Sequence, residues 1–267
     1  MARDDLAEFL RSRRAAIDPS QVGLPRGARR RAPGLRREEV ALLAGVSVTW
    51  YTWLEQGREI NASQSVLDAL ARTLLLDEAE HAHLLALAEP ETAHPEILDR
   101  EHPPGALISV ITALDPNPAY VLGPRWEYLA WNNAQGRLYP AGHLAEDDRN
   151  LMWIVFADPA GRELIADWDN EARNMISQFR ADTTAIRSDP MVVELVHRLQ
   201  DASPEFAEWW PQHDVSGFHT RLRRYNHATA GELLFEYQQL VPAEWPHFRV
   251  VAQLPVPGDD SARRLAG

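Results

Sequence analysis

The residues best suited to chemistry lie near the N-terminus, where the segment RGARRR (residues 26–31) is followed by Arg36 and Arg37. Guanidinium groups form charge-assisted and often bidentate hydrogen bonds to phosphate, so this cluster suits a nucleic-acid backbone. Residues 1–37 hold ten arginines against four acidic residues, a balance of +6, whereas residues 91–267 carry a balance of −11. This distribution predicts that only the N-terminal part meets a polyanion, the alternative being arginines that merely coat a helix surface.

Other clusters of reactive side chains give little support for catalysis. Asp167-Trp-Asp169 is more typical of a solvated helix face than of a metal site, and His213-Asp214 has no second His-Asp pair at suitable spacing. His81 and His83 are two residues apart, so on a helix they point in different directions. The sequence has no cysteine, no Gly-rich phosphate loop, no His-Glu-x-x-His and no Gly-x-Ser-x-Gly. We therefore expect neither an enzyme nor a metal or cofactor site.

Hydropathy indicates a cytoplasmic protein. No stretch approaches the ~20 consecutive apolar residues of a membrane span, and the N-terminus lacks the apolar region of a signal peptide.

The elements that must position the arginines are helices. Apolar residues recur at helical spacing over 5–17, 36–44 and 47–57, and two further helices begin at the capping residues Ser63 and Asp77. The region 18–33 is rich in Pro, Gly and Arg, which is typical of a loop. Residues 1–92 are thus predicted to form one all-α domain of five helices.

The rest of the chain has a different residue pattern, which indicates strands as well as helices. Residues 93–104 are acidic and rich in Pro, which favours a linker. Tyr120 to Trp131 indicates a β-hairpin, and three helices are expected to begin at the Pro residues of 158–159, 189–190 and 203–204. One apolar stripe runs from Leu164 to Phe179, and about three strands are expected near the end. Residues 105–258 are predicted to form an α+β domain with a mostly antiparallel sheet.

The stretch REEVALLAGVSVTWYTWLEQGRE (residues 37–59) has the pattern of a helix-turn-helix. Ala41 is small where the two helices cross, Gly45 suits a corner with positive φ, and Val46 fills the core at the turn. Tyr51 and Leu54 bury the inner face of the second helix, which leaves the opposite face for a major groove. The alternative is an ordinary α-hairpin in a helical bundle.

With these features the stretch LRREEVALLAGVSVTWYTWLEQGREINASQSVLDALARTLLLDEAEHAHLLALA resembles the Xre-type, λ-repressor-like helix-turn-helix regulators. More narrowly it resembles the MmyB-like group, in which this domain precedes a PAS-like ligand-binding domain. AYVLGPRWEYLAWN, RNLMWIVFADP, ADWDNEAR, SPEFAEWWPQHDV and GELLFEYQQL are similar to segments of that second domain. The resemblance covers nearly the whole chain.

The resemblance implies roles for particular positions of the first domain. Arg14 and Glu55 match a buried ion pair that ties the first helix to the third and orients a phosphate contact. Val48, Thr49 and Trp53 match the base-reading face but are poor hydrogen-bond donors, so specificity is expected to depend also on arginines and DNA shape. The residues expected to contact DNA are Arg29, Arg30, Arg31, Arg36, Arg37, Ser47, Val48, Thr49, Thr52, Trp53 and Arg58.

For the second domain the resemblance implies a pocket for a small apolar ligand, a fatty acid being one such class. Ligand pockets are lined by aromatic side chains with a few polar anchors, although each aromatic residue is individually more typical of a core. The residues expected to bind the ligand are Trp126, Trp131, Asn132, Trp153, Phe156, Trp168, Arg180, Trp210 and His227.

These observations predict a sequence-specific transcription regulator that binds a double-stranded operator as a homodimer and responds to its ligand. The alternative is a DNA-binding regulator whose second domain only mediates dimerisation or protein contacts. A third hypothesis is an enzyme with a DNA-binding head.

Overall fold

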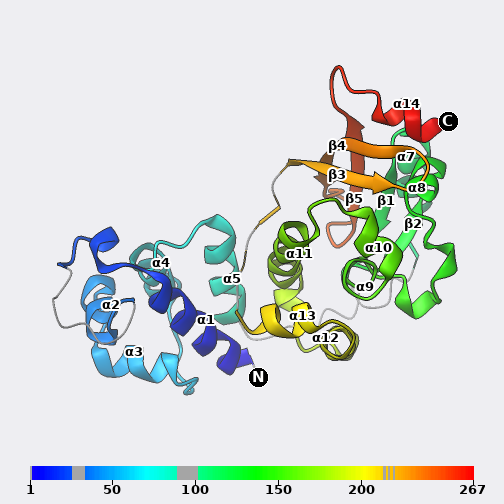
Figure 1. The fold of residues 1–267 in the computed structure, drawn as a ribbon. Coiled ribbons are helices and arrows are strands. Elements are labelled where there is room, and N and C mark those ends of the chain that lie inside the picture. The colour runs from blue at the N-terminus through cyan, green and yellow to red at the C-terminus, as the bar shows by residue number, and fades with distance from the viewer. Residues whose placement is uncertain (1, 26–33, 89–101, 213–214, 216, 219) are drawn as a thin grey trace. The chain divides into compact units, whose positions relative to one another are not determined.

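The computed structural model of the protein describes residues 2–25, 34–88, 102–212, 215, 217–218 and 220–267. The chain forms two compact units (Figure 1). The first, called the helical unit, comprises Met1–Thr92, Arg180–Asp189 and Trp210–Gly217. The second, called the sheet unit, comprises Ala93–Phe179, Pro190–Trp209 and Phe218–Gly267. Within the described residues no helix combines the length and apolar character needed to span a bilayer.

The helical unit contains α1 (Ala2–Ala16), a 3₁₀ turn (Pro19–Val22), α2 (Arg37–Ala44), α3 (Val48–Glu55), α4 (Gln64–Thr73) and α5 (Glu78–Ala88). The five helices expected from the sequence are therefore confirmed over residues 2–88. Their apolar faces share one core, in which Phe9, Leu10, Tyr51, Leu70 and Leu84 are fully buried. This burial, rather than the propensity of such short helices, holds the unit together.

The corner between α2 and α3 follows from three residues. Gly45 adopts a left-handed conformation (φ 70°), which costs little only for glycine. The Val46 N–H then donates to the Ala41 carbonyl, closing α2. Ser47 accepts a hydrogen bond from the Trp50 N–H at 3.1 Å and so caps α3. The corner fixes α3 across α2, as a helix-turn-helix requires.

The sheet unit is built on five antiparallel strands: β1 (Ala119–Leu122), β2 (Tyr128–Trp131), β3 (Arg221–His227), β4 (Gly231–Leu240) and β5 (Arg249–Pro255). Their order is β2-β1-β5-β4-β3. The predicted hairpin within residues 120–131 and the antiparallel α+β architecture are confirmed.

The remaining helices are α7 (Gly105–Ala113), α8 (Asn133–Leu138), α9 (Leu151–Phe156), α10 (Pro159–Leu164), α11 (Trp168–Thr183), α12 (Pro190–Ala202), α13 (Pro204–Trp209) and α14 (Ser261–Ala266). Short 3₁₀ turns lie at Ala141–His143, Glu146–Asp148, Thr184–Ile186 and Trp210–Gln212.

The three helices expected at proline residues begin there, as α10, α12 and α13. The apolar stripe from Leu164 to Phe179 does not lie on one helix, because α10 ends at Leu164 and α11 begins at Trp168. Between them Ile165 is extended and forms a β-bridge with Tyr225 of β3. The apolar residues therefore keep a helical spacing in the sequence although residues 165–167 separate the two helices.

The two faces of the sheet differ in polarity. Ala119, Val121 and Val250 pack against Leu107 and Ile111 of α7 and form a dry apolar layer. Register places Tyr120, Gln253, Tyr237 and Arg223 on the opposite face, toward α8, α9 and α10. Since buried polar groups cost free energy unless they are hydrogen-bonded, the second face is the one that invites a functional explanation.

Candidate functional site

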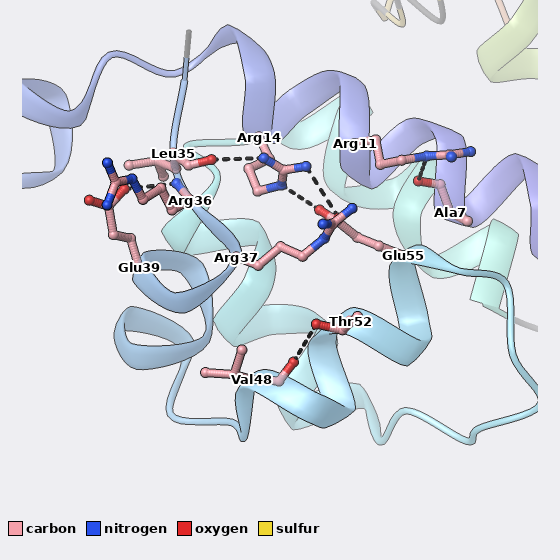
Figure 2. A network of polar contacts seen from close by, with 10 residues as sticks. All are labelled: Ala7, Arg11, Arg14, Leu35, Arg36, Arg37, Glu39, Val48, Thr52 and Glu55. Carbon is pink, nitrogen blue, oxygen red and sulfur yellow. Dashed lines mark hydrogen bonds and ion pairs between the residues drawn. The ribbon is translucent and has the colours of Figure 1, made fainter. Parts of the chain in front are cut away.

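A buried carboxylate organises the helix-turn-helix (Figure 2). The Glu55 side chain at the end of α3 has no exposed surface, and it accepts hydrogen bonds from Arg14 Nε at 2.5 Å and from Arg37 Nε at 2.6 Å. Arg14 also donates to the Leu35 carbonyl at 2.8 Å. One carboxylate thus joins α1, α2 and α3. The Arg14–Glu55 ion pair that the resemblance implied is part of this network.

The Arg37 guanidinium is held at one edge and open at the other. Its Nε is bonded to Glu55, while 44% of the side chain remains exposed. A cation fixed in this way would lose little side-chain entropy on meeting an anion.

Burial of Glu55 alone would raise its pKa, but the hydrogen bonds from Arg14 and Arg37 outweigh that effect and hold the pKa below its ordinary value. A carboxyl whose pKa is lower in the folded state stabilises the fold above its unfolded pKa, about 4.3. That stabilisation is lost as the pH falls through the folded value.

We therefore expect the unfolding temperature of the helical unit to fall as the pH drops below about 4.3. Circular dichroism melts between pH 7 and pH 3 measure it. A Glu55→Gln variant should be less stable at pH 7 and show a flatter pH dependence. Equal slopes in the two proteins would mean that Glu55 does not carry this pH dependence.

The outer face of α3 holds the predicted base-reading residues. Val48, Thr49 and Trp53 are exposed, while Tyr51 and Leu54 are buried. The Thr52 hydroxyl donates to the Val48 carbonyl at 2.7 Å and is partly buried, so Thr52 offers mainly acceptor capacity. The Arg58 guanidinium lies 5.6 Å from the Trp53 ring centre.

The other residues predicted to contact DNA include Arg36, the loop arginines and Ser47. Arg36 is exposed at the N-terminus of α2, where its backbone N–H donates to the Glu39 carboxylate at 2.8 Å. Arg29, Arg30 and Arg31 lie outside the described residues, so their contact with DNA stays a prediction. Ser47 caps α3 and so helps to fix where that helix begins.

The sheet unit contains a cavity between the polar face of the sheet and three helices. It measures about 430 Å³ counted to its open mouth, with a free interior of about 40 Å³. The lining residues are Tyr120, Tyr128, Gln135, Leu138, Tyr139, Leu151, Ile154, Val155, Gly161, Leu164, Ile165, Arg223, Tyr225 and Gln253. The lining combines four tyrosines, two glutamines and one arginine with aliphatic residues of α8, α9 and α10. Such a wall can bind a ligand with one polar and one apolar end.

None of the nine residues predicted to bind a ligand lines this cavity. Phe156 and Trp168 pack edge to face at 5.5 Å between ring centres, and Phe156 contacts Phe206 and Trp209 in the same way. The Trp168 Nε1–H donates to the Val155 carbonyl at 2.8 Å. These rings form the core between α9, α11 and α13, the alternative that the sequence left open for any single aromatic residue.

The side chains of Asn132 and His227 form hydrogen bonds to backbone groups. The Asn132 side-chain oxygen caps α8 by accepting from the Gln135 N–H at 2.9 Å, and its amide nitrogen donates to the carbonyls of Ile111 and Asn117. His227 Nε2 donates to the Arg137 carbonyl at 2.9 Å. Both side chains fix loops around the sheet rather than facing the cavity.

Three of the five remaining residues have packing partners within the sheet unit. Trp126, at φ 63°, packs on Phe179, and Trp131 packs on Tyr128. Arg198 lies over the Trp153 ring at 4.3 Å.

Arg180 and Trp210 belong to the helical unit, where the guanidinium stacks on the indole at 4.0 Å and donates to the Trp210 carbonyl. They therefore lie outside the unit that holds the cavity.

The sequence does not reveal the cavity residues, because several of them are polar at buried strand positions, the reverse of the usual hydropathy pattern. In β3, Leu222 is exposed while its neighbour Arg223 is buried, and Gln253 is a buried polar residue within the largely apolar strand β5. Polar residues at inward strand positions were the available signal. Among the described residues, no group of His, Cys, Asp or Glu side chains has the arrangement of a metal site.

Comparison with known families matches these two regions separately. A family model described as the MmyB-like transcription regulator ligand binding domain matches residues 103–266, more than half of the chain. A second model, described as a helix-turn-helix domain, matches residues 5–84. Both describe domains of regulators rather than enzymes. No curated protein matches the chain.

Proposed function

The chain belongs to the MmyB-like transcription regulators, and on that premise we propose that it binds a two-fold DNA operator as a homodimer under the control of a small ligand. The observation that carries this proposal is the helix-turn-helix itself, in which Glu55 fixes α3 and holds Arg37 ready for a phosphate. Action in the cytoplasm is part of the same proposal.

On DNA, α3 lies in the major groove with Val48, Thr49 and Trp53 toward the bases. Val48 and Thr49 are suited to thymine methyl groups, since apolar side chains read that feature. Arg36 and Arg37 at the start of α2, Arg58 and the loop arginines Arg29 to Arg31 bind the phosphate backbone. These contacts fix register, while DNA shape contributes the remaining specificity. In a dimer the two α3 helices would lie about one turn of the DNA double helix apart.

In the sheet unit, the ligand occupies the cavity between the sheet and α8 to α10. The aliphatic side chains of that wall suit the apolar body that the family resemblance implies, and a fatty acid is one class to test. Control of operator affinity requires that the ligand bind one state of the dimer better than another. The coupling free energy of such systems is typically about 1–3 kcal/mol.

Replacing Arg37 with alanine should weaken operator binding about tenfold and lower the slope of log affinity against log salt concentration by about one. The reason is the loss of one positioned phosphate contact. Fluorescence anisotropy with an operator duplex between 50 and 300 mM salt measures both quantities.

The matched control is Arg263→Ala in α14, which removes an arginine whose side chain is largely exposed in the sheet unit. We expect it to leave affinity and salt slope unchanged. If Arg37→Ala binds like the wild type while Glu55 still pairs with Arg14, the placement of Arg37 on the phosphate backbone is wrong.

A further inference from the structure

The connection between α8 and α9 carries a histidine in contact with a buried carboxylate. His143 ends the 3₁₀ turn Ala141–His143, and 44% of its side chain is exposed. Its Nε2 lies 3.3 Å from Asp158 Oδ1, and its Nδ1 lies 2.8 Å from the Pro140 carbonyl oxygen. Asp158 itself is only 9% exposed. One imidazole thus connects the surface of the sheet unit with a carboxylate in its interior.

This geometry requires a charged imidazole. A carbonyl oxygen and a carboxylate oxygen can only accept hydrogen bonds, so both ring nitrogens of His143 must carry a proton to bond to them. In either neutral tautomer, one nitrogen would turn a lone pair toward an oxygen atom. Loss of a proton therefore replaces one hydrogen bond by a repulsive contact, which a movement of the ring or of residues 139–144 relieves.

The same carboxylate holds two residues that line the cavity. Asp158 Oδ2 accepts hydrogen bonds from the Tyr139 hydroxyl at 2.7 Å and from the Gly161 N–H at 3.0 Å. Burial works against the charged form of Asp158, but the hydrogen bonds that it accepts hold its pKa below the ordinary value. Burial and the neighbouring carboxylate raise the pKa of Tyr139. Asp158 therefore stays charged and Tyr139 stays neutral in the pH range where a histidine titrates.

His143 is the member of this cluster that titrates near neutral pH. The hydrogen bond to the Pro140 carbonyl raises its pKa, partial burial lowers it, and the contact with Asp158 raises it again, so the pKa lies above the ordinary value of 6.5. Within the described part of the chain, two titratable side chains contact His143: Asp158 from the N-cap of α10, and Tyr139, whose ring centre lies 5.8 Å from that of the imidazole. A group whose pKa is raised by folding stabilises the fold below its unfolded pKa, about 6.5. That stabilisation is lost as the pH rises through the folded value.

We propose that the charge of His143 regulates the cavity: the imidazolium fixes the Asp158 carboxylate and the two lining residues bonded to it, whereas the neutral ring releases them. The cavity then binds its ligand more tightly at slightly acidic pH than at slightly alkaline pH. Because the pair is half-exposed, the expected change is only about two- to fivefold. This proposal rests on the proposed function, since it concerns the regulation of that ligand cavity.

The first test needs no ligand and follows hydrogen exchange of the Gly161 amide in the full chain by NMR, at about pH 6 and about pH 8.5. The exchange rates are corrected for their intrinsic dependence on pH. In the wild type we expect this amide to be about two to five times better protected at the lower pH. His143→Gln cannot become charged, so its protection should equal the lower, alkaline value at both pH values.

The second test measures decanoate binding to the same proteins by isothermal titration calorimetry. An ordinary carboxylate is ionised at both pH values, so a change in affinity reports on the protein. We expect the wild type to bind decanoate about two to five times more tightly at the lower pH, and His143→Gln to bind it equally weakly at both. The matched control is His197→Gln, since His197 is an exposed histidine on α12 of the same unit. It should keep the full pH dependence.

The outcomes separate this proposal from the proposed function. If Gly161 is equally protected at both pH values in the wild type, or if His143→Gln keeps the pH dependence, control by His143 is overturned while a ligand cavity stands. If protection changes with pH but decanoate affinity does not, the regulation of binding is overturned. If decanoate binds at neither pH, the cavity as a site for fatty acids is rejected, and the exchange data still decide the role of His143. Loss of the pH dependence in His197→Gln would assign it to another histidine and overturn the proposal.

Discussion

Replacing Glu55 with alanine is expected to lower the free energy of unfolding of the helical unit by about 3–5 kcal/mol and to abolish measurable operator binding. The variant leaves Arg14 and Arg37 without the carboxylate between them. Only 18% of the Arg14 side chain is exposed, so water compensates its charge poorly. Uncompensated charge in such a place costs far more than the original pair contributes. The loss also frees α1, α2 and α3 from their common anchor. Thermal or urea unfolding followed by circular dichroism measures the effect.

The matched control is Glu59→Ala. Glu59 also pairs with an arginine, Arg3, at 2.8 Å, but 82% of the Glu59 side chain is exposed. An exposed pair is screened by water and salt, so this variant should unfold like the wild type. Equal unfolding curves for the Glu55 and Glu59 variants would contradict the structural role given to Glu55.

The second large effect is expected from Gly161→Ala in the sheet unit. A Cβ at this position would lie 2.0 Å from the Ile154 carbonyl oxygen, and that oxygen belongs to the backbone of α9. Helices α9 and α10 must separate to admit it, at a typical overpacking cost of about 1–3 kcal/mol. Both residues line the cavity, so binding of any cavity ligand should weaken together with stability. Calorimetric unfolding measures the loss of stability, and calorimetric titration with a fatty acid such as decanoate measures the loss of ligand binding.

Gly142→Ala provides the comparison, because a Cβ there would meet no atom within 4 Å. It should leave both stability and binding unchanged. A Gly161→Ala protein as stable as the wild type would mean that α9 and α10 are less closely packed than described.

The helix-turn-helix could be predicted from sequence because each constraint on it is local. A glycine with positive φ, a small residue at the crossing and a serine cap lie within seven positions, 41–47. The Arg14–Glu55 pair, in contrast, spans 41 residues, and family resemblance rather than spacing pointed to it. The second contact of Glu55, with Arg37, could not be predicted from sequence, because the spacing of apolar residues does not show which arginines share a carboxylate.

The cavity could not be predicted, because its residues come from seven separate segments of the chain and several of them are polar residues at buried positions. Trp168 and Phe156 are large and aromatic, which suits a ligand pocket, yet large aromatic rings are also the residues that fill a core most effectively. The lining includes buried polar strand residues such as Tyr120 and Gln253, whose role depends on which face of the sheet they occupy. Register between β1, β5 and β4 decides that face, and register is a property of the folded sheet.

The central claim is that this protein recognises a particular DNA sequence through α3, and the most direct test is selection from a random duplex library by the full chain. Affinities are then measured for the enriched sequence and for a scrambled duplex of equal composition at the same salt concentration. We expect a two-fold symmetric sequence to be enriched and to bind at least about a thousand times more tightly than the scrambled duplex. Enrichment of no sequence, or equal affinity for the two duplexes, would contradict the claim.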